Sequence, residues 1–245
     1  MSLAIVYTRA QVGIDAPLVT VEVHLSGGLP SFSIVGLPET AVKESRERVR
    51  SALINSGYDF PQRRITVNLA PADLPKEGGR YDLAIAMGIL AASAQVSAES
   101  LTSLELIGEL ALSGALRPVA GVLPVALACR EAKRGLLLPA ANGDDATLAS
   151  GLNVYPANHL LDVCAHLKGE QLISCAIAKS FEHSYQAVYP DLSDVKGQFQ
   201  AKRALEIAAA GSHNLLLVGP PGSGKSMLAN RLPGLLPDMT ESERL

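Results

Sequence analysis

A glycine-rich octapeptide near the end of the sequence is the segment whose residue types and spacing point most directly to chemistry. Residues 219–226 read Gly-Pro-Pro-Gly-Ser-Gly-Lys-Ser and match GxxxxGK[ST] at every position. Glycines let backbone N–H groups turn inward around a phosphate. Lys225 brings a compact charge to the β- and γ-phosphates, and the Ser226 hydroxyl suits Mg²⁺. The predicted ATP and Mg²⁺ site comprises Gly219, Pro220, Pro221, Gly222, Ser223, Gly224, Lys225 and Ser226.

The segments beside this loop fit such a site. Leu215–Val218 is continuously apolar, which is typical of a parallel strand covered on both faces. A helix is expected from about Lys225 to Arg231. Only residues 227–245 follow the motif, and each parallel crossover needs a dozen or more residues. We therefore expect the sequence to be an N-terminal fragment of a longer ATPase, inactive alone and with Lys225 as its one catalytic candidate.

Composition bounds the other possibilities. The 245 residues carry a formal net charge of -3, so bulk charge gives no sign of nucleic acid or an anionic membrane as a partner. Apolar residues make up 48% and Trp is absent, which predicts a sizeable aliphatic core. The three cysteines form no CxxC pair, which favours a reducing cytoplasm. No apolar run approaches the ~20 residues of a membrane span, so no membrane role is expected.

Strands and helices alternate before the loop, which predicts an α/β (α+β) fold. Val19–Leu25 alternates with period two, as in a half-buried strand. Together with Leu3–Thr8 and Phe32–Val35 it predicts an antiparallel opening sheet. Asp82 can cap a helix through Leu83–Ala92. Further expected elements are a helix at about 39–55, strands at 65–69, 104–107 and 136–138, a hairpin over 109–118, helices at 122–133 and 198–210, and two short helices around a strand over 144–167.

A domain boundary is expected near residues 180–190. Phe181–Tyr185 is polar and aromatic with no clear period, and a second unit starts at Asp191. We predict a domain over 1–180, a linker over 181–190, and the incomplete start of an ATPase domain over 191–245.

Several motifs together resemble the magnesium-chelatase-like AAA+ family, also called YifB or ComM. They are Asp-Val-Lys-Gly-Gln at 194–198, Ala-Lys-Arg-Ala-Leu at 201–205, Gly-Ser-His-Asn-Leu-Leu-Leu at 211–217, the loop 219–226, Gly-Leu-Pro at 36–38, the segment 68–76 and Tyr-Asp-Leu at 81–83. The resemblance implies a Lon-protease-like (ribosomal S5 domain 2-like) domain before a AAA+ ATPase. It further implies Val195 and Gly197 near the adenine, a hexameric ring, and a DNA helicase that drives branch migration in natural transformation.

The Lon-like resemblance raises proteolysis as a second activity. Proteases of that type use a Ser nucleophile and a Lys base. By resemblance, Arg80 stands at the place of the nucleophile and Leu123 at that of the lysine. Neither side chain can perform that chemistry, so the domain is predicted to be a non-proteolytic scaffold or substrate-gripping element.

Basic residues in the first domain offer a candidate DNA surface. Arg46 and Arg50, with Arg48, Arg63 and Arg64, could contact phosphates, although the interleaved glutamates favour a solvated helix face. Lys76 and Arg80, in a glycine-rich loop, suit either DNA or a subunit interface. The weak overall basicity keeps an alternative open, in which a chelatase-type ATPase remodels a protein partner without any role on DNA.

Overall fold

A computed structural model describes residues 3–36, 40–177, 189–237, 239–240 and 243. The chain divides into two compact units, Met1–Lys179 and Ser180–Leu245. Most of the predicted linker, residues 181–188, lies outside the described residues.

The first unit is a mixed α/β structure, which confirms the predicted fold class. Its strands are β1 (Leu3–Arg9), β2 (Leu18–Ser26), β3 (Ser31–Val35), β4 (Arg64–Ala70), β5 (Leu104–Leu106), β6 (Glu109–Leu110), β7 (Leu116–Arg117), β8 (Gly135–Pro139) and β9 (Val154–Ala157). Its α-helices are α1 (Thr40–Asn55), α2 (Asp82–Ala92), α3 (Val122–Glu131), α4 (Gly143–Ala146) and α5 (Leu160–Lys168). Each predicted strand and helix of this unit is present, with boundaries that shift by a few residues.

Seven strands form one sheet in the order β3-β4-β2-β1-β5-β8-β9. The pairs β1–β2 and β2–β4 are antiparallel, and the other four pairs are parallel. The prediction of an antiparallel opening block is therefore wrong for β3, which pairs in parallel with β4. The reason is that α1 connects β3 to β4, and a helical crossover returns the chain to the same end of the sheet.

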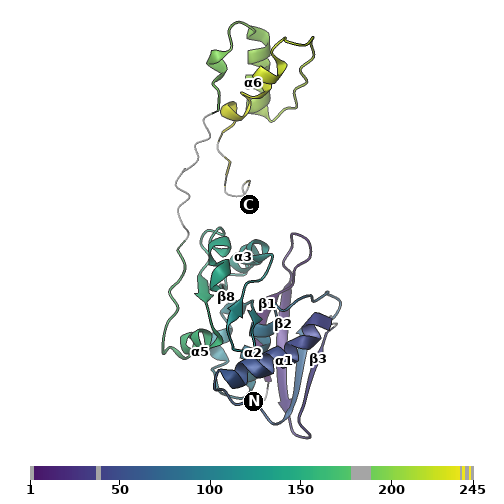
Figure 1. Ribbon diagram of the computed structural model, residues 1–245, viewed down its shortest axis with the longest axis vertical. Helices are drawn as coiled ribbons and strands as arrows, with labels where there is room; N and C mark the ends of the chain where they lie inside the picture. The colour runs from purple at the N-terminus through teal and green to yellow at the C-terminus, as the bar shows by residue number, and fades with distance from the viewer. Residues whose placement is uncertain (1–2, 37–39, 178–188, 238, 241–242, 244–245) are drawn as a thin grey trace. The chain divides into compact units, whose positions relative to one another are not determined.

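The two halves of the sheet are covered differently. Helices α1 and α2 lie side by side over β1, β2 and β3 (Figure 1). In β2, Val19, Val21 and Val23 are fully buried, whereas the alternate side chains are half-buried or exposed. Strand β8 is instead covered on both faces, because Leu137 packs in the core beneath α2 and Leu136 and Leu138 pack against α3. The alternating and continuous apolar patterns of the sequence correspond to this difference.

Helix α2 is the central element of this core. All eleven of its residues are buried, including Asp82 at its first position. Asp82 does not cap the helix as predicted; its carboxylate accepts hydrogen bonds from Arg48 Nε (2.7 Å) and Nη2 (3.1 Å) and from the Leu110 backbone N–H (3.2 Å). This ion pair joins α1, α2 and the β6–β7 hairpin, and a bidentate guanidinium is the partner that such a buried carboxylate needs.

A second buried ion pair fixes the middle of the sheet. Glu105 of β5 is fully buried and accepts from Arg9 Nε (2.6 Å) and Nη2 (2.9 Å). Arg134 Nη1 (3.2 Å) and the Cys129 thiol (3.1 Å) also donate to this carboxylate. Although burial lowers the pKa of Arg9, the hydrogen bond and charge of Glu105 outweigh it and raise that pKa overall. The pairing neutralises charge where water is excluded.

The backbone at Gly36, at the end of β3, leaves no room for a larger side chain. It has φ +101°, and a Cβ there would overlap the Leu69 carbonyl oxygen. We expect Gly36→Ala to lower the free energy of unfolding by about 3 kcal/mol, from backbone strain plus overlap. The matched control is Gly28→Ala, at φ +119° with open space around its Cβ, for which about 1 kcal/mol is expected. Urea unfolding of both variants is the measurement, and equal effects would show that the overlap does not contribute.

The second unit is small. It contains α6 (Phe199–Gly211), α7 (Lys225–Ala229), and short 3₁₀ turns at Leu192–Asp194 and Pro233–Leu235. Its core consists of Leu192, Val195, Leu205 and Leu228. The prediction of a strand at Leu215–Val218 is wrong here, since this segment forms no ladder within the described part of the chain and Leu216 and Val218 are exposed. A strand exists only through hydrogen bonds to a neighbouring strand, and residues 189–237 contain none with which this segment could pair.

Candidate nucleotide-binding site

The loop 219–226 has the backbone that its glycines predict. Gly222 and Gly224 have φ +79° and +86°, and an added Cβ at Gly222 would meet open space. Gly224 immediately precedes α7, which begins at Lys225. A turn closes within the loop, where the Ser223 N–H donates to the Pro220 carbonyl (3.3 Å). Left-handed positions of this kind allow successive backbone N–H groups to face one side of a loop, which is the arrangement that anion binding requires.

Lys225 is held across the mouth of this loop. Its Nζ donates to the carbonyl oxygens of Gly219 and Pro220 (both 2.8 Å) and lies 3.4 Å from Ser223 Oγ. Among the described residues no carboxylate forms an ion pair with this ammonium group. Uncharged carbonyl groups therefore hold the ammonium group in place, and its positive charge is available to a phosphate. Ser226 follows on the first turn of α7, next to Lys225.

A residue of the 194–198 motif contacts the loop. Gln198 precedes α6 with φ +53° and makes no capping hydrogen bond with its side chain. Its Nε2 instead donates to the Ser223 carbonyl (3.2 Å). The structure therefore brings the 194–198 motif against the 219–226 motif, although 25 positions separate the two hydrogen-bonded residues. The joint presence of both motifs was the only sequence signal for this contact.

The two residues predicted to lie near the adenine occupy different environments. Val195 is buried, packing with Leu205 of α6 and Leu228 of α7, so it lies against the helix that follows the loop. Gly197 is exposed, has φ +69°, and has open space where a Cβ would be. The structure thus brings Val195 to the phosphate-loop helix, while an adenine contact for either residue stays a prediction.

The proposed DNA-contact residues separate into two groups. Arg46 and Arg50 are exposed on α1; Arg46 Nη1 donates to the Phe32 carbonyl (3.3 Å), and the Arg50 guanidinium lies over the Phe60 ring at 5.1 Å. Lys76 and Arg80 are buried, with exposed fractions of 0% and 8%. The folded loop turns both cations inward, and a contact of either one with DNA or with a neighbouring subunit stays a prediction.

The two positions compared with a protease dyad, Arg80 and Leu123, carry no such chemistry. Arg80 Nη2 donates to the Ala120 carbonyl (2.9 Å), three residues before Leu123 at the start of α3. Arg80 also donates to Gln11 Oε1 (2.7 Å). A guanidinium and an aliphatic side chain provide neither a nucleophile nor a base.

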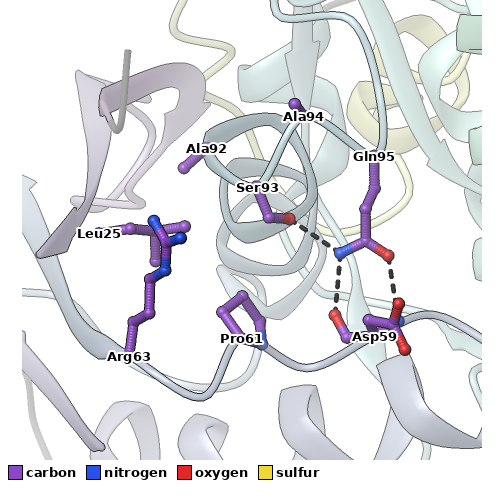
Figure 2. Close-up of a pocket in the computed structure, with 8 residues that line it drawn as sticks. All are labelled: Leu25, Asp59, Pro61, Arg63, Ala92, Ser93, Ala94 and Gln95. Carbon is purple, nitrogen blue, oxygen red and sulfur yellow. Dashed lines mark hydrogen bonds between the residues drawn. The ribbon is translucent and has the colours of Figure 1, made fainter. Parts of the chain in front are cut away.

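A pocket of about 480 Å³ lies where α2 ends, and Figure 2 shows the Gln95 amide facing Ser93 and Asp59 in it. Gln95 Oε1 accepts from the Asp59 N–H (3.0 Å), while its Nε2 donates to the Asp59 carbonyl and to Ser93 Oγ (both 2.8 Å). These contacts tie the loop after α1 to the end of α2. The Gln95 amide is satisfied by these partners, which indicates a structural junction.

The described residues hold no group of three or more His, Cys, Asp or Glu side chains placed to bind a metal ion. In the same residues, no helix is both long enough and apolar enough to cross a membrane.

These features define a class of protein in which an α/β unit is followed by a separate small unit that carries a phosphate-binding loop (P-loop) at residues 219–226. The family model for subunit ChlI of Mg-chelatase matches residues 21–142, and that for magnesium chelatase, subunit ChlI, matches residues 191–245. The chain belongs to the magnesium-chelatase-like YifB/ComM family.

Three relatives show the extent of the similarity. Competence protein ComM of Haemophilus influenzae is 56% identical over 248 residues, covering all of this chain and 49% of the relative. Uncharacterized protein YifB of Escherichia coli is 54% identical over 250 residues, with 48% of its length covered. Uncharacterized protein Rv2897c of Mycobacterium tuberculosis is 43% identical over 246 residues, again with 48% covered. The chain spans about half the length of the curated relatives it matches.

Proposed function

We propose that the chain binds Mg²⁺-ATP on the Gly219–Ser226 loop, and that ATP hydrolysis by the whole protein drives the movement of DNA strands. The observation that carries the nucleotide proposal is the position of Lys225, whose ammonium group is held by loop carbonyls and has no ion-pair partner among the described residues. Phosphoryl transfer depends on such positioned charge more than on covalent chemistry. Ser226 would hold the Mg²⁺ that bridges the β- and γ-phosphates.

The DNA part of the proposal has separate support. The relative that is 56% identical is named a competence protein. Arg46 and Arg50 are exposed on one helix and suit phosphate contacts. A ring of six subunits in the cytoplasm, with each nucleotide at a subunit boundary, is the assembly we propose for the whole protein.

Strand exchange is the direct test. We expect the whole protein, at concentrations where it forms a ring, to move strands in three- or four-stranded DNA substrates only when ATP and Mg²⁺ are present. The matched comparison is Arg46→Ala/Arg50→Ala, which removes both exposed cations and is expected to weaken DNA binding while leaving nucleotide binding unchanged. Absence of ATP-dependent exchange by an assembled, nucleotide-bound ring would overturn the DNA proposal.

A protein-remodelling ATPase is the second candidate. It is favoured by the net charge of -3 and by the burial of Lys76 and Arg80, which removes two cations from the surface predicted for DNA. ATPase rates with and without DNA discriminate between the two candidates. Stimulation by DNA supports the motor, and an unchanged rate supports a protein partner.

A further inference from the structure

Arg80 differs from the buried Arg9 and the half-buried Arg48 of the first unit in having no carboxylate that pairs with it. Arg9 pairs with Glu105, and Arg48 pairs with Asp82, each through two hydrogen bonds of 2.6–3.1 Å. Arg80 is 8% exposed, yet within the described ranges it forms no ion pair. A buried guanidinium that no carboxylate contacts directly is costly, so an anion that reaches it gains a hydrogen-bonded ion pair that the fold does not supply.

The hydrogen bonds of Arg80 show which of its groups remain available. Nη2 donates to Gln11 Oε1 (2.7 Å) and to the Ala120 carbonyl (2.9 Å), which uses both of its protons. Nη1 is buried and has no hydrogen-bond partner. Burial lowers the pKa of Arg80, whereas the pKa values of Arg9 and Arg48 are raised. The side chain therefore has two unused donors, and no carboxylate forms an ion pair with it within the described residues.

A pocket of about 490 Å³ adjoins this side chain. It lies between residues 11–13 and residues 75–81, and Gln11, Glu77 and Arg80 are among the side chains that line it. Gln11 is exposed, so its amide can leave the guanidinium without unfolding the surrounding core. An anion in its place would accept one proton of Nη2 and gain Nη1, a bidentate arrangement on one guanidinium.

We propose that this pocket binds a carboxylate, from the acidic side chain or the C-terminus of a peptide, which displaces Gln11 and pairs with Arg80. A single planar guanidinium matches the two oxygens of a carboxylate. Glu77 lines the same pocket and repels negative charge, which disfavours a doubly charged phosphate more than a singly charged carboxylate. Val12 and Pro75 also line it and suit an organic group beside the carboxylate. The site is independent of the proposed nucleotide site.

The test is an NMR titration of the ¹⁵N-labelled 245-residue chain with three probes: N-acetyl-aspartate methylamide, N-acetyl-alanine and inorganic phosphate. We expect saturable shifts of the Gly13 and Gly121 amides with the carboxylates and weaker binding of phosphate. Tighter binding of the aspartate probe identifies a side-chain carboxylate as the ligand, and tighter binding of N-acetyl-alanine identifies a C-terminus. Saturable shifts with neither carboxylate, or tighter binding of phosphate, overturn the proposal.

Four variants locate the binding. Arg80→Met is expected to abolish the shifts, and Arg63→Met, at an exposed arginine, is expected to leave them unchanged. Gln11→Ala removes the competing acceptor and should tighten carboxylate binding by about tenfold. Glu77→Gln should tighten it by about threefold, because it removes a repelling charge. The last two changes are at exposed residues and decide the question even if Arg80→Met fails to fold; unchanged or weakened binding in both would contradict the proposal.

Discussion

Replacing Glu105 with alanine is expected to lower the free energy of unfolding of the first unit by about 3–5 kcal/mol. The carboxylate is fully buried and is the common acceptor for Arg9, Arg134 and the Cys129 thiol. Its removal leaves the Arg9 guanidinium buried with only the carbonyls of Ala16 and Ala128 as acceptors. The lost counter-charge costs more than the lost volume, because a cation that is left unpaired in the interior keeps its full desolvation penalty.

Urea or thermal unfolding of the variant measures this effect, and Glu109→Ala is its matched control. Glu109 also pairs with an arginine, Arg117 at 3.3 Å, but both side chains are partly exposed. Water screens such a pair, so less than about 1 kcal/mol is expected from the control. The double variant Arg9→Met/Glu105→Leu should recover much of the stability lost in Glu105→Ala, because it removes both charges. Equal losses in Glu105→Ala and Glu109→Ala would show that burial does not determine the strength of the pair.

Lys225→Ala is expected to weaken Mg²⁺-ATP binding by at least about tenfold and to abolish ATP hydrolysis by the whole protein. The ammonium group is the positive charge that the loop itself positions, and its contacts to Gly219 and Pro220 aim it at the mouth of the loop. Loss of that charge leaves backbone N–H groups to hold the phosphates by themselves. Equilibrium binding of a fluorescent ATP analogue, measured with Mg²⁺ present, gives the affinity.

Lys202→Ala, on α6 in the same unit, controls for the loss of one positive charge elsewhere in that unit. This variant should bind the analogue with the affinity of the unchanged chain. Thermal unfolding of both variants separates a loss of binding from a loss of structure. Unchanged affinity in a folded Lys225→Ala variant would remove the basis for the proposed nucleotide site, and with it that for the ATP-driven motor.

Local patterns were sufficient for most elements of the fold. The period of two in Val19–Leu25 correctly predicted a strand with one buried face, and the apolar run Leu136–Leu138 correctly predicted a strand. Both patterns follow from the alternation of side chains along a strand, which is a property of the local backbone. The left-handed glycines of the phosphate loop followed from its motif for the same reason.

Only the tertiary structure decided which distant residues meet. The parallel partner of β3, the pairing of Asp82 with Arg48 across 34 positions, and that of Glu105 with Arg9 across 96 have no local signature, since each depends on how helices and strands pack. Arg80 is the clearest case. The sequence by itself determined a cation in a glycine-rich loop, whereas folding enclosed its guanidinium beside Gln11 and Ala120. Exposure is set by the elements that pack over a residue, and that arrangement arises from contacts far apart along the chain.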